Sequence, residues 1–426
     1  MKKKMGLTTK IFIGLITGLI FGLILYPIRE NVFVSKVLIG FVFQLGGKAF
    51  ISAIKMMVVP LVLVSLTCGA AAIGDVKKLG RVGVRTLAFY LVTTAIAITL
   101  AITLANIVAP GLGLDLGTLD KTEYTIKQSK PFVQVLIDMV PTNPIKSLAE
   151  GNMLQIIVFA LLMGTGLTIL GDKAKKIKDL FEEANTLVLK LVEIVMKMAP
   201  IGVFCLIART FATLGYEPMV PLAKYMITVL GALVIHAIVT YQGMLYAFTG
   251  LNPIKFFKNF SPAMLVAFST ASSSSTLPIT IETAEKRLGV SKNIASFTLP
   301  LGATINMDGT AIMQGVATVF IAQVYGMSLG LPQYLTVILT ATLASVGTAG
   351  VPGVGLIMLS MVLQQVNLPV EGIALIMGID RLLDMSRTAI NITGDAACSM
   401  IIAKKEGELD VDVFNSDNED AEIEVA

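Results

Sequence analysis

Long apolar segments alternate with short polar ones along nearly the whole chain. A helix needs about 20 predominantly apolar residues to cross a bilayer. The segments long enough for a span are 8–28, 36–71, 86–109, 185–214, 221–249, 296–326 and 374–403. The stretch 132–170 is also apolar, but Pro141 and Pro144 interrupt it, so we expect several short helices that together cross once. This pattern predicts an all-α polytopic membrane protein.

Two further apolar segments contain too much Ser, Gly and Pro to be simple spans. Segment 259–291 centres on Ser272–Pro278, and segment 332–370 centres on Ser345–Gly353. Irregular backbone at membrane depth is tolerated only where protein covers it or where it lines a water-filled cavity. Both segments are therefore predicted to be re-entrant helical hairpins whose tips lie inside the protein.

Each predicted hairpin precedes a span that carries a short polar sequence, Asn306–Thr310 in the first case and Asp384–Asp395 in the second. Charged and amide groups at membrane depth are costly and by default mark a binding site. Both sequences contain Asn-x-x-Gly, and we expect Gly309 and Gly394 to interrupt their helices. A repeated hairpin followed by an interrupted span predicts inverted repeats around a site at the bilayer midplane.

Composition supports a membrane protein and excludes an ordinary soluble one. Of the 426 residues, 55% are hydrophobic and 15% are charged, whereas a soluble protein carries about 25% charged residues. The net charge of +4 does not indicate nucleic-acid binding, because the basic residues sit at the ends of apolar segments. The cysteines, Cys68, Cys205 and Cys398, have neither metal-site nor disulfide spacing.

Loop charges predict the orientation. Basic residues cluster at 77–85, 173–178, 255–258 and 404–405, and cytoplasmic loops carry the excess of Lys and Arg. Counting spans from a cytoplasmic N-terminus places all of these clusters on the cytoplasmic side. The N-terminal apolar run is interpreted as an uncleaved first helix. The acidic segment 406–426 lacks apolar periodicity and is predicted to be a disordered cytoplasmic tail.

The polar sequences and hairpins resemble those of the dicarboxylate/amino acid:cation symporter family, which includes the glutamate transporters and their prokaryotic homologues. The resemblance covers residues 8–405 and is most specific between 270 and 396. The segments that carry it are Ser272–Pro278, Leu299–Thr310, Ser345–Gly355 and Asp384–Asp395. It implies a glutamate-transporter-like elevator fold with eight transmembrane helices, two re-entrant hairpins and inverted repeats, assembled as a homotrimer in the cell membrane.

The resemblance also implies a division of the chain into a scaffold and a moving transport domain. Residues 1–75 would hold scaffold helices 1 and 2, and residues 111–218 would hold scaffold helices 4 and 5. Transport-domain helix 3 would lie in 76–110. The core of that domain would lie in 219–405, with helix 6, hairpin 1, helix 7, hairpin 2 and helix 8.

The resemblance assigns substrate-binding roles to named residues. Arg387 matches the arginine that receives a side-chain carboxylate, for which a planar, two-pronged guanidinium is well suited. Asp384 matches the carboxylate that binds an α-amino group, with Thr388 assisting. The groups around the α-carboxylate match Ser273, Thr310 and Asn391, and the outer gate matches Val351 and Gly355. A purely structural ion pair between Arg387 and Asp384 is the alternative interpretation.

The resemblance implies sodium ions as coupling ions, bound at three places through oxygen atoms, which suit hard cations. One site would be made by Gly302, Asn306, Asn391 and Asp395. A second would use carbonyls of Thr304, Ser345, Val346 and Thr348. A third would be made by Tyr90, Thr93, Thr94, Asn306 and Asp308. In membrane helices, however, hydroxyls such as those of Thr93 and Thr94 commonly bond to the preceding turn.

Together these matches imply sodium-coupled symport of L-aspartate or L-glutamate. C4-dicarboxylate carriers of the family lack an acid at the Asp384 position, and neutral amino acid carriers lack the arginine. Proton-coupled relatives often carry an amide at the Asp395 position. Proton-coupled glutamate/aspartate transport, C4-dicarboxylate transport and an anion channel remain alternatives. The serine run has no paired base, so no enzyme is indicated.

The chain departs from the family pattern near the substrate site. Ala271 and Met385 stand at positions where archaeal and animal members, respectively, carry an arginine. Arg381, one helical turn before Met385, is a candidate for the missing positive charge, but it could instead pair with Asp380 or reach the membrane interface. His236, the one histidine of the chain, is interpreted as a packed, hydrogen-bonded residue.

Overall fold

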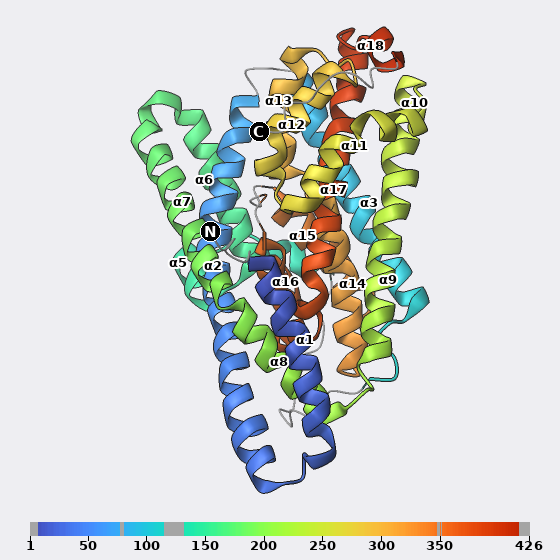
Figure 1. Cartoon of the computed structure of the whole chain (residues 1–426). Coiled ribbons are helices and arrows are strands. Elements are labelled where there is room, and N and C mark those ends of the chain that lie inside the picture. The colour runs from blue at the N-terminus through green and yellow to red at the C-terminus, as the bar shows by residue number, and fades with distance from the viewer. Residues whose placement is uncertain (1–6, 77–80, 115–131, 347–349, 351, 417–426) are drawn as a thin grey trace, which may run out of the picture.

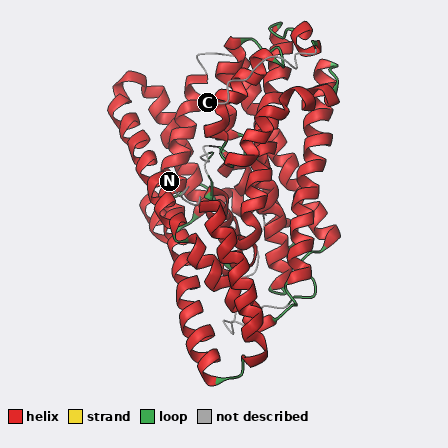
Figure 2. Ribbon diagram, viewed as in Figure 1, coloured by secondary structure: helices red, strands yellow, loops and turns green. Residues whose placement is uncertain are grey.

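The computed structural model describes residues 7–76, 81–114, 132–346, 350 and 352–416. Nearly all of them are helical, and the β-bridge found among them joins Val290 and Leu409. Figure 2 shows helices throughout the described chain. The predicted all-α class is confirmed. In Figure 1, α17 runs between α2, α6 and α7 on one side and α9 on the other.

The first helices pack through small residues. They are α1 (Leu7–Leu25), the π-helix η2 (Phe33–Phe43) that leads into α2 (Gln44–Val76), and α3 (Arg81–Val108). Helix α1 lies on α8, and a Cβ on Gly18 or Gly22 would come within 2.8 Å or 2.7 Å of an α8 carbonyl oxygen. Glycines four residues apart therefore let the two backbones approach closely, as is common in membrane helices.

The middle of the chain is divided into shorter helices. They are α4 (Phe132–Asp138), α5 (Pro144–Glu150), α6 (Met153–Leu170), α7 (Lys175–Lys197) and α8 (Ala199–Leu214). Asn143 caps α5 by accepting from Lys146 N, and Pro144 follows it in the first turn, as the interruption at this point predicts. The single span 185–214 is wrong: the helix ends at Met198, and Pro200 lies in the first turn of α8.

The second half contains both hairpins. A long helical segment formed by α9 (Met219–Ile235), the π-helix η5 (His236–Gln242) and α10 (Gly243–Thr249) precedes them. Hairpin 1 consists of α11 (Pro253–Thr270) and α12 (Ser273–Lys286), and hairpin 2 consists of α15 (Leu331–Ser345) and α16 (Val354–Gln365). Between them lie α13 (Lys292–Ile305) and α14 (Asp308–Val324), and α17 (Ile373–Glu406) follows hairpin 2.

The two Asn-x-x-Gly sequences do not play matching backbone roles. The chain between α13 and α14 leaves the helix at Asn306 and Met307, so the interruption lies just before Gly309. Helix α17 continues through Gly394, which corrects the prediction of a break there. Gly394 instead makes room: a Cβ would lie 2.6 Å from Asn306 Nδ2 and would also collide with the ring of Tyr241.

The beginning of the predicted tail is ordered. Asp410 N donates to Gly289 O at 2.8 Å, and α18 (Val411–Asn415) follows. Asn259 Nδ2 donates to both Arg287 O and Phe414 O at 3.0 Å, and Phe414 is fully buried. The prediction of a disordered segment from residue 406 is therefore corrected up to residue 416. This segment, which we call the C-terminal clasp (406–416), packs on the open end of hairpin 1, opposite its tip. Residues 417–426 lie outside the described ones.

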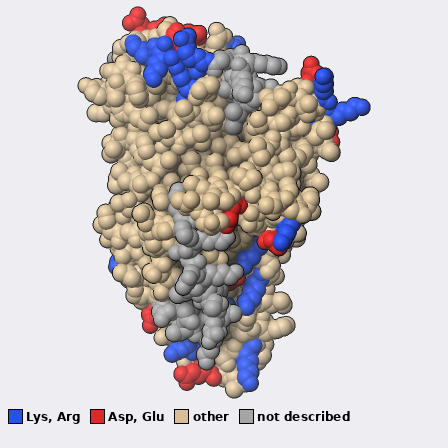
Figure 3. Space-filling view, turned by 180° about the vertical axis from the view of Figure 1, so that it is seen from behind, with Lys and Arg blue, Asp and Glu red and all other residues tan. Residues whose placement is uncertain are grey.

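Membrane character is evident in helix lengths and in surface charge. Among the described residues, five helical segments are long and apolar enough to span a membrane: Thr9–Ile28, Phe33–Ala71, Arg81–Val108, Met153–Lys197 and Met219–Thr249. On the face drawn in Figure 3, a broad uncharged area separates charged side chains gathered at the top from those along the lower part. The protein is an integral membrane protein.

Phe414→Ala should release the C-terminal clasp. Removing a buried phenylalanine side chain costs about 3–5 kcal/mol, and Phe414 is the fully buried side chain of the clasp's short helix α18. We expect faster backbone hydrogen exchange at 287–291 and 407–416, measured by mass spectrometry. Tyr246→Ala, at a 62% exposed position, is the control. Unchanged exchange at both segments would contradict this role of Phe414.

Candidate functional site

A small cavity lies where the two hairpin tips meet α14 and α17. Its volume is about 20 Å³, room for about one water molecule. Its lining includes six of the predicted substrate residues: Ser273, Thr310, Gly355, Asp384, Thr388 and Asn391. Ala271, Met307, Gly350 and Val354 complete it. Of the other predicted substrate residues, Arg387 lies just behind Gly355, and Val351 lies outside the described residues.

The two hairpin tips are in direct contact beside the cavity. Ser272 Oγ donates to Gly350 O at 2.8 Å, which joins hairpin 1 to hairpin 2. Ser272 also caps α12 by accepting from Ser275 N. The first residue of α12, Ser273, lines the cavity, so the helix presents its N-terminal end there. A helix N-terminus has free N–H groups and attracts a carboxylate.

Arg387 forms a buried ion network with two carboxylates of its own helix. It is 1% exposed; Nη1 donates to Asp380 Oδ1 at 2.6 Å, and Nη2 donates to Asp384 Oδ1 at 2.8 Å. A Cβ on Gly355 would lie 3.3 Å from Arg387 Nη2, so the glycine lets the start of α16 approach this edge of the guanidinium closely. Arg387 Nε is buried and has no hydrogen-bond partner among the described residues. The ion pair of the alternative interpretation therefore exists, but it borders the cavity.

Asp380 is a site residue that sequence reasoning missed. It is 5% exposed and bonds Arg387. Positions 380, 384 and 387 follow helical spacing and share one face of α17. Acidic and basic residues at that spacing in an apolar span are the sequence signal that could have identified Asp380.

Arg381 places a second positive charge beside the site. Its Nη1 lies 3.4 Å from Asp384 Oδ2, and its side chain is 16% exposed. Arg381 therefore brings its charge next to a carboxylate that lines the cavity. Ala271, where the archaeal members have an arginine, lines the same cavity with a left-handed φ of 51°.

A hydrogen-bond network connects the two polar sequences beneath the cavity. Asn306 Nδ2 donates to Asn391 O at 3.0 Å and to Asp395 Oδ1 at 2.9 Å. Gly309 N donates to Asn391 Oδ1 at 2.7 Å. Asn306 Oδ1 is buried and accepts no hydrogen bond from the described residues. A buried oxygen that lacks a donor is suited to a cation, since buried polar groups are normally satisfied.

Gly302 and Asp395 complete the first predicted cation site. A Cβ on Gly302 would collide with Asp395 Oδ1, so the backbone of α13 lies directly against that carboxylate. Asp395 is 1% exposed. The four residues predicted for this site are thus brought together.

The third predicted cation site is also assembled, around Asp308. Thr94 Oγ1 donates to Asp308 Oδ1 at 2.5 Å, and the hydroxyls of Thr93 and Thr94 lie 3.2 Å and 2.8 Å from Tyr90 O. Two residues outside the prediction join them. Tyr241 Oη donates to Asp308 Oδ2 at 2.8 Å, and His236 Nε2 lies 3.1 Å from the same oxygen. His236 is hydrogen-bonded, as predicted, and its partner is a site carboxylate.

The second predicted cation site is described only in part. Thr304 lies in the last turn of α13, Ser345 ends α15, and Val346 follows it. A Cβ on Gly350 would lie 2.9 Å from Ala303 O, so the tip of hairpin 2 reaches the end of α13. Helix C-termini carry free carbonyl groups and favour cations. Thr348 lies outside the described residues.

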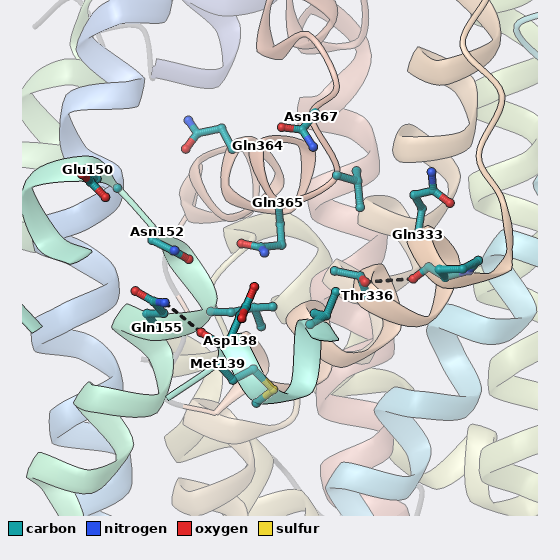
Figure 4. A pocket seen from close by; sticks show the side chains of 15 residues that line it. Asp138, Met139, Glu150, Asn152, Gln155, Gln333, Thr336, Gln364, Gln365 and Asn367 are labelled. Carbon is teal, nitrogen blue, oxygen red and sulfur yellow. Dashed lines mark hydrogen bonds between the residues drawn. The ribbon is translucent and has the colours of Figure 1, made fainter. Parts of the chain in front are cut away.

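A larger cavity lies between the middle helices and hairpin 2. It has a volume of about 500 Å³ and is bordered by α4–α6, the first turns of α15 and the end of α16. Figure 4 shows that amide side chains dominate this space; those labelled are Asn152, Gln155, Gln333, Gln364, Gln365 and Asn367. None of the predicted site residues that the structure describes lines it. The facing surfaces of α4–α6 and of hairpin 2 are polar and, at this cavity, are not packed against each other.

Comparison with known proteins supports the resemblance. Residues 7–405 match the family model described as the sodium:dicarboxylate symporter family. A proton/sodium-glutamate symport protein of Geobacillus stearothermophilus is 38% identical over 95% of this chain and 96% of its own. A proton/glutamate-aspartate symporter of Escherichia coli (strain K12) is 38% identical over 96% of this chain and 94% of its own. A C4-dicarboxylate transport protein of Bacillus subtilis (strain 168) is 34% identical over 96% of both chains.

Gly309→Ala should separate α14 from α17. The added methyl would lie 2.7 Å from Arg387 O and 3.0 Å from Asn391 Oδ1, and overpacking of this kind costs about 1–3 kcal/mol. We expect a lower unfolding temperature of the detergent-purified protein in a fluorimetric melt. Gly231→Ala is the matched control, because it also lies in a helix but has nothing within 4 Å of the new methyl. A Gly309→Ala protein as stable as the control would refute the argument.

Proposed function

The chain belongs to the sodium:dicarboxylate symporter family and is a transporter rather than an enzyme, and we propose that it is a sodium-coupled symporter of acidic amino acids, L-aspartate or L-glutamate. The observation that carries this proposal is the buried ion pair between Asp384, which lines the cavity, and Arg387, which lies behind Gly355. Their opposite charges suit the two ends of one zwitterionic, acidic substrate.

Substrate recognition rests on exchange of partners within the ion network. Arg387 shares its donors with Asp380 and Asp384, so a substrate carboxylate that takes one edge of the guanidinium frees Asp384 for the α-ammonium group. Asp380 keeps the other edge fixed, which limits the entropy lost on binding. The free N–H groups of α12 and the amide of Asn391 suit the remaining carboxylate. A substrate without an ammonium leaves Asp384 without that partner, which is the basis for selectivity.

Sodium is the proposed coupling ion because the candidate cation sites offer carboxylate, amide and hydroxyl oxygens, which suit a hard cation. Asp308 and Asp395 are both buried, and a buried carboxylate without a cation nearby is costly. Asn306 Oδ1, which has no hydrogen-bond partner among the described residues, belongs to the side chain that bonds Asp395 through Nδ2. The relatives include proteins named for proton as well as sodium coupling, so proton coupling is the alternative.

An elevator movement is the proposed transport mechanism. In this proposal, residues 1–75 and 111–218 form a trimeric scaffold, and residues 76–110 and 219–405 move as the transport domain in the cell membrane, with both termini cytoplasmic. The open, amide-lined cavity between α4–α6 and hairpin 2 supports the division, because loosely packed polar surfaces suit sliding. Lys55 and Glu371 pair across the proposed boundary at 2.8 Å, where an exposed ion pair contributes little and can break readily.

Uptake into proteoliposomes tests the proposed function. An inward sodium gradient should drive accumulation of radiolabelled L-aspartate or L-glutamate, whereas a proton gradient without sodium should not. Accumulation driven by the pH gradient in sodium-free buffer would favour the proton-coupled alternative. Inhibition by succinate as strong as that by aspartate would favour a C4-dicarboxylate carrier.

Arg387→Lys should weaken uptake of acidic amino acids while keeping the positive charge. Lysine cannot hold Asp380 and a substrate carboxylate with the same fork geometry, and loss of a charge-assisted hydrogen bond corresponds to roughly 10-fold to 100-fold in KM. The measurement is the concentration dependence of sodium-driven uptake. Ser386→Ala, on the exposed side of the same helix turn, is the control. An unchanged KM in Arg387→Lys would remove the arginine from the substrate site.

A further inference from the structure

The carboxylate of Asp308 has two oxygens in different situations. Oδ1 has one hydrogen-bond donor, Thr94, which belongs to the predicted cation ligands. Oδ2 is held by Tyr241 at 2.8 Å and by His236 Nε2 at 3.1 Å, and neither residue belongs to a predicted site. All of these side chains are fully buried. One oxygen is thus fixed, and the other is held by a single hydroxyl that can rotate.

We propose that His236 and Tyr241 are positioning residues for the cation site at Asp308, which hold Oδ2 so that Oδ1 and Thr94 are presented to the coupling ion. The inference rests on the proposed cation coupling and goes beyond it, because it assigns the site's affinity to two residues that do not ligate the ion. When an ion approaches Oδ1, the Thr94 hydroxyl can direct its proton to Tyr90 O, which lies 2.8 Å away. The rest of the carboxylate is already in place, which lowers the cost of organising the site.

The local backbone brings these two residues together. They are five residues apart, and an α-helix would point them about 140° away from each other. The segment between them is the π-helix η5 (His236–Gln242), whose hydrogen bonds join residues five apart. Their rings meet edge to face at a centroid distance of 4.5 Å. Short π-helical turns occur frequently at functional sites, and here the turn creates a pair of donors aimed at one oxygen.

The histidine ring makes its hydrogen bond through one nitrogen. Nδ1 is buried and has no partner among the described residues, while Nε2 faces a carboxylate oxygen. In the neutral ring only one nitrogen carries a proton, so the proton belongs on Nε2, where it is donated to Asp308. A buried nitrogen without a hydrogen-bond partner is unfavourable. The orientation of the ring therefore favours the hydrogen bond at Nε2 and leaves Nδ1 without one among the described residues.

Asp308 also lies at the N-terminus of a helix, which stabilises a negative charge. It opens α14, immediately after the interruption at Asn306 and Met307. Gly394 keeps space for the Tyr241 ring, since a Cβ there would collide with it. The positioning pair is therefore built against α17 as well as α14, and it lies next to the Asn306 side chain that reaches Asp395.

A pair of substitutions separates positioning from packing. His236→Leu fills similar space but cannot donate, whereas His236→Gln keeps an N–H donor at similar reach. Tyr241→Phe removes one hydroxyl and keeps the ring, so it tests the same idea with little risk to folding. The readout is sodium binding by the detergent-purified protein, measured as the rise in unfolding temperature during titration with NaCl against choline chloride at constant ionic strength.

We expect the half-saturating sodium concentration to rise roughly tenfold in His236→Leu and in Tyr241→Phe, and to stay within about threefold of the wild type in His236→Gln. Equal effects of Leu and Gln at position 236, or no effect of Tyr241→Phe, would overturn the inference. A wild-type protein that sodium does not stabilise would instead overturn the proposed sodium coupling together with the inference. A sodium response in the wild type that all three variants retain would overturn the inference alone.

Discussion

Charged groups inside a membrane protein must find their partners within the protein, and this constraint organises the second half of the chain. Arg387 is balanced by Asp380 and Asp384, and Asp308 is surrounded by hydroxyl and imidazole donors. Each partnership depends on backbone that comes unusually close, at Gly309, Gly355 or Gly394. Because an unpartnered buried charge is so costly, these contacts fix how α14, α17 and the hairpin tips pack, and the rest of the bundle forms around them.

Length and hydropathy were enough to predict the all-α class, and the positions of Ser, Gly and Pro predicted the two hairpins and the broken stretch before α6. Hydropathy alone did not locate the break at Met198, whose local signal is Pro200 in the first turn of the next helix. Gly394 was misread because glycine serves two purposes: it can bend a helix, or it can make room for a neighbour. Only the position of Tyr241 decides between them.

The predicted binding residues largely converge, since polar groups in apolar spans have few reasons to be there other than binding. The residues that were missed, Asp380, Tyr241 and His236, support other side chains. Helical spacing was a signal for Asp380, and the single histidine in an apolar span was a weaker one. Nothing in the sequence revealed the π-helix that pairs His236 with Tyr241, because such turns are set by tertiary contacts.

The C-terminal clasp has a consequence for how the protein is made. Asn259 of hairpin 1 bonds Phe414, which lies 155 residues later in the chain. Chains are synthesised from the N-terminus, so the open end of hairpin 1 lacks these backbone partners until hairpin 2 and α17 have been made. Hairpin 1 therefore cannot reach its final structure on its own, because its completion depends on a segment that is synthesised after every other helix around the site.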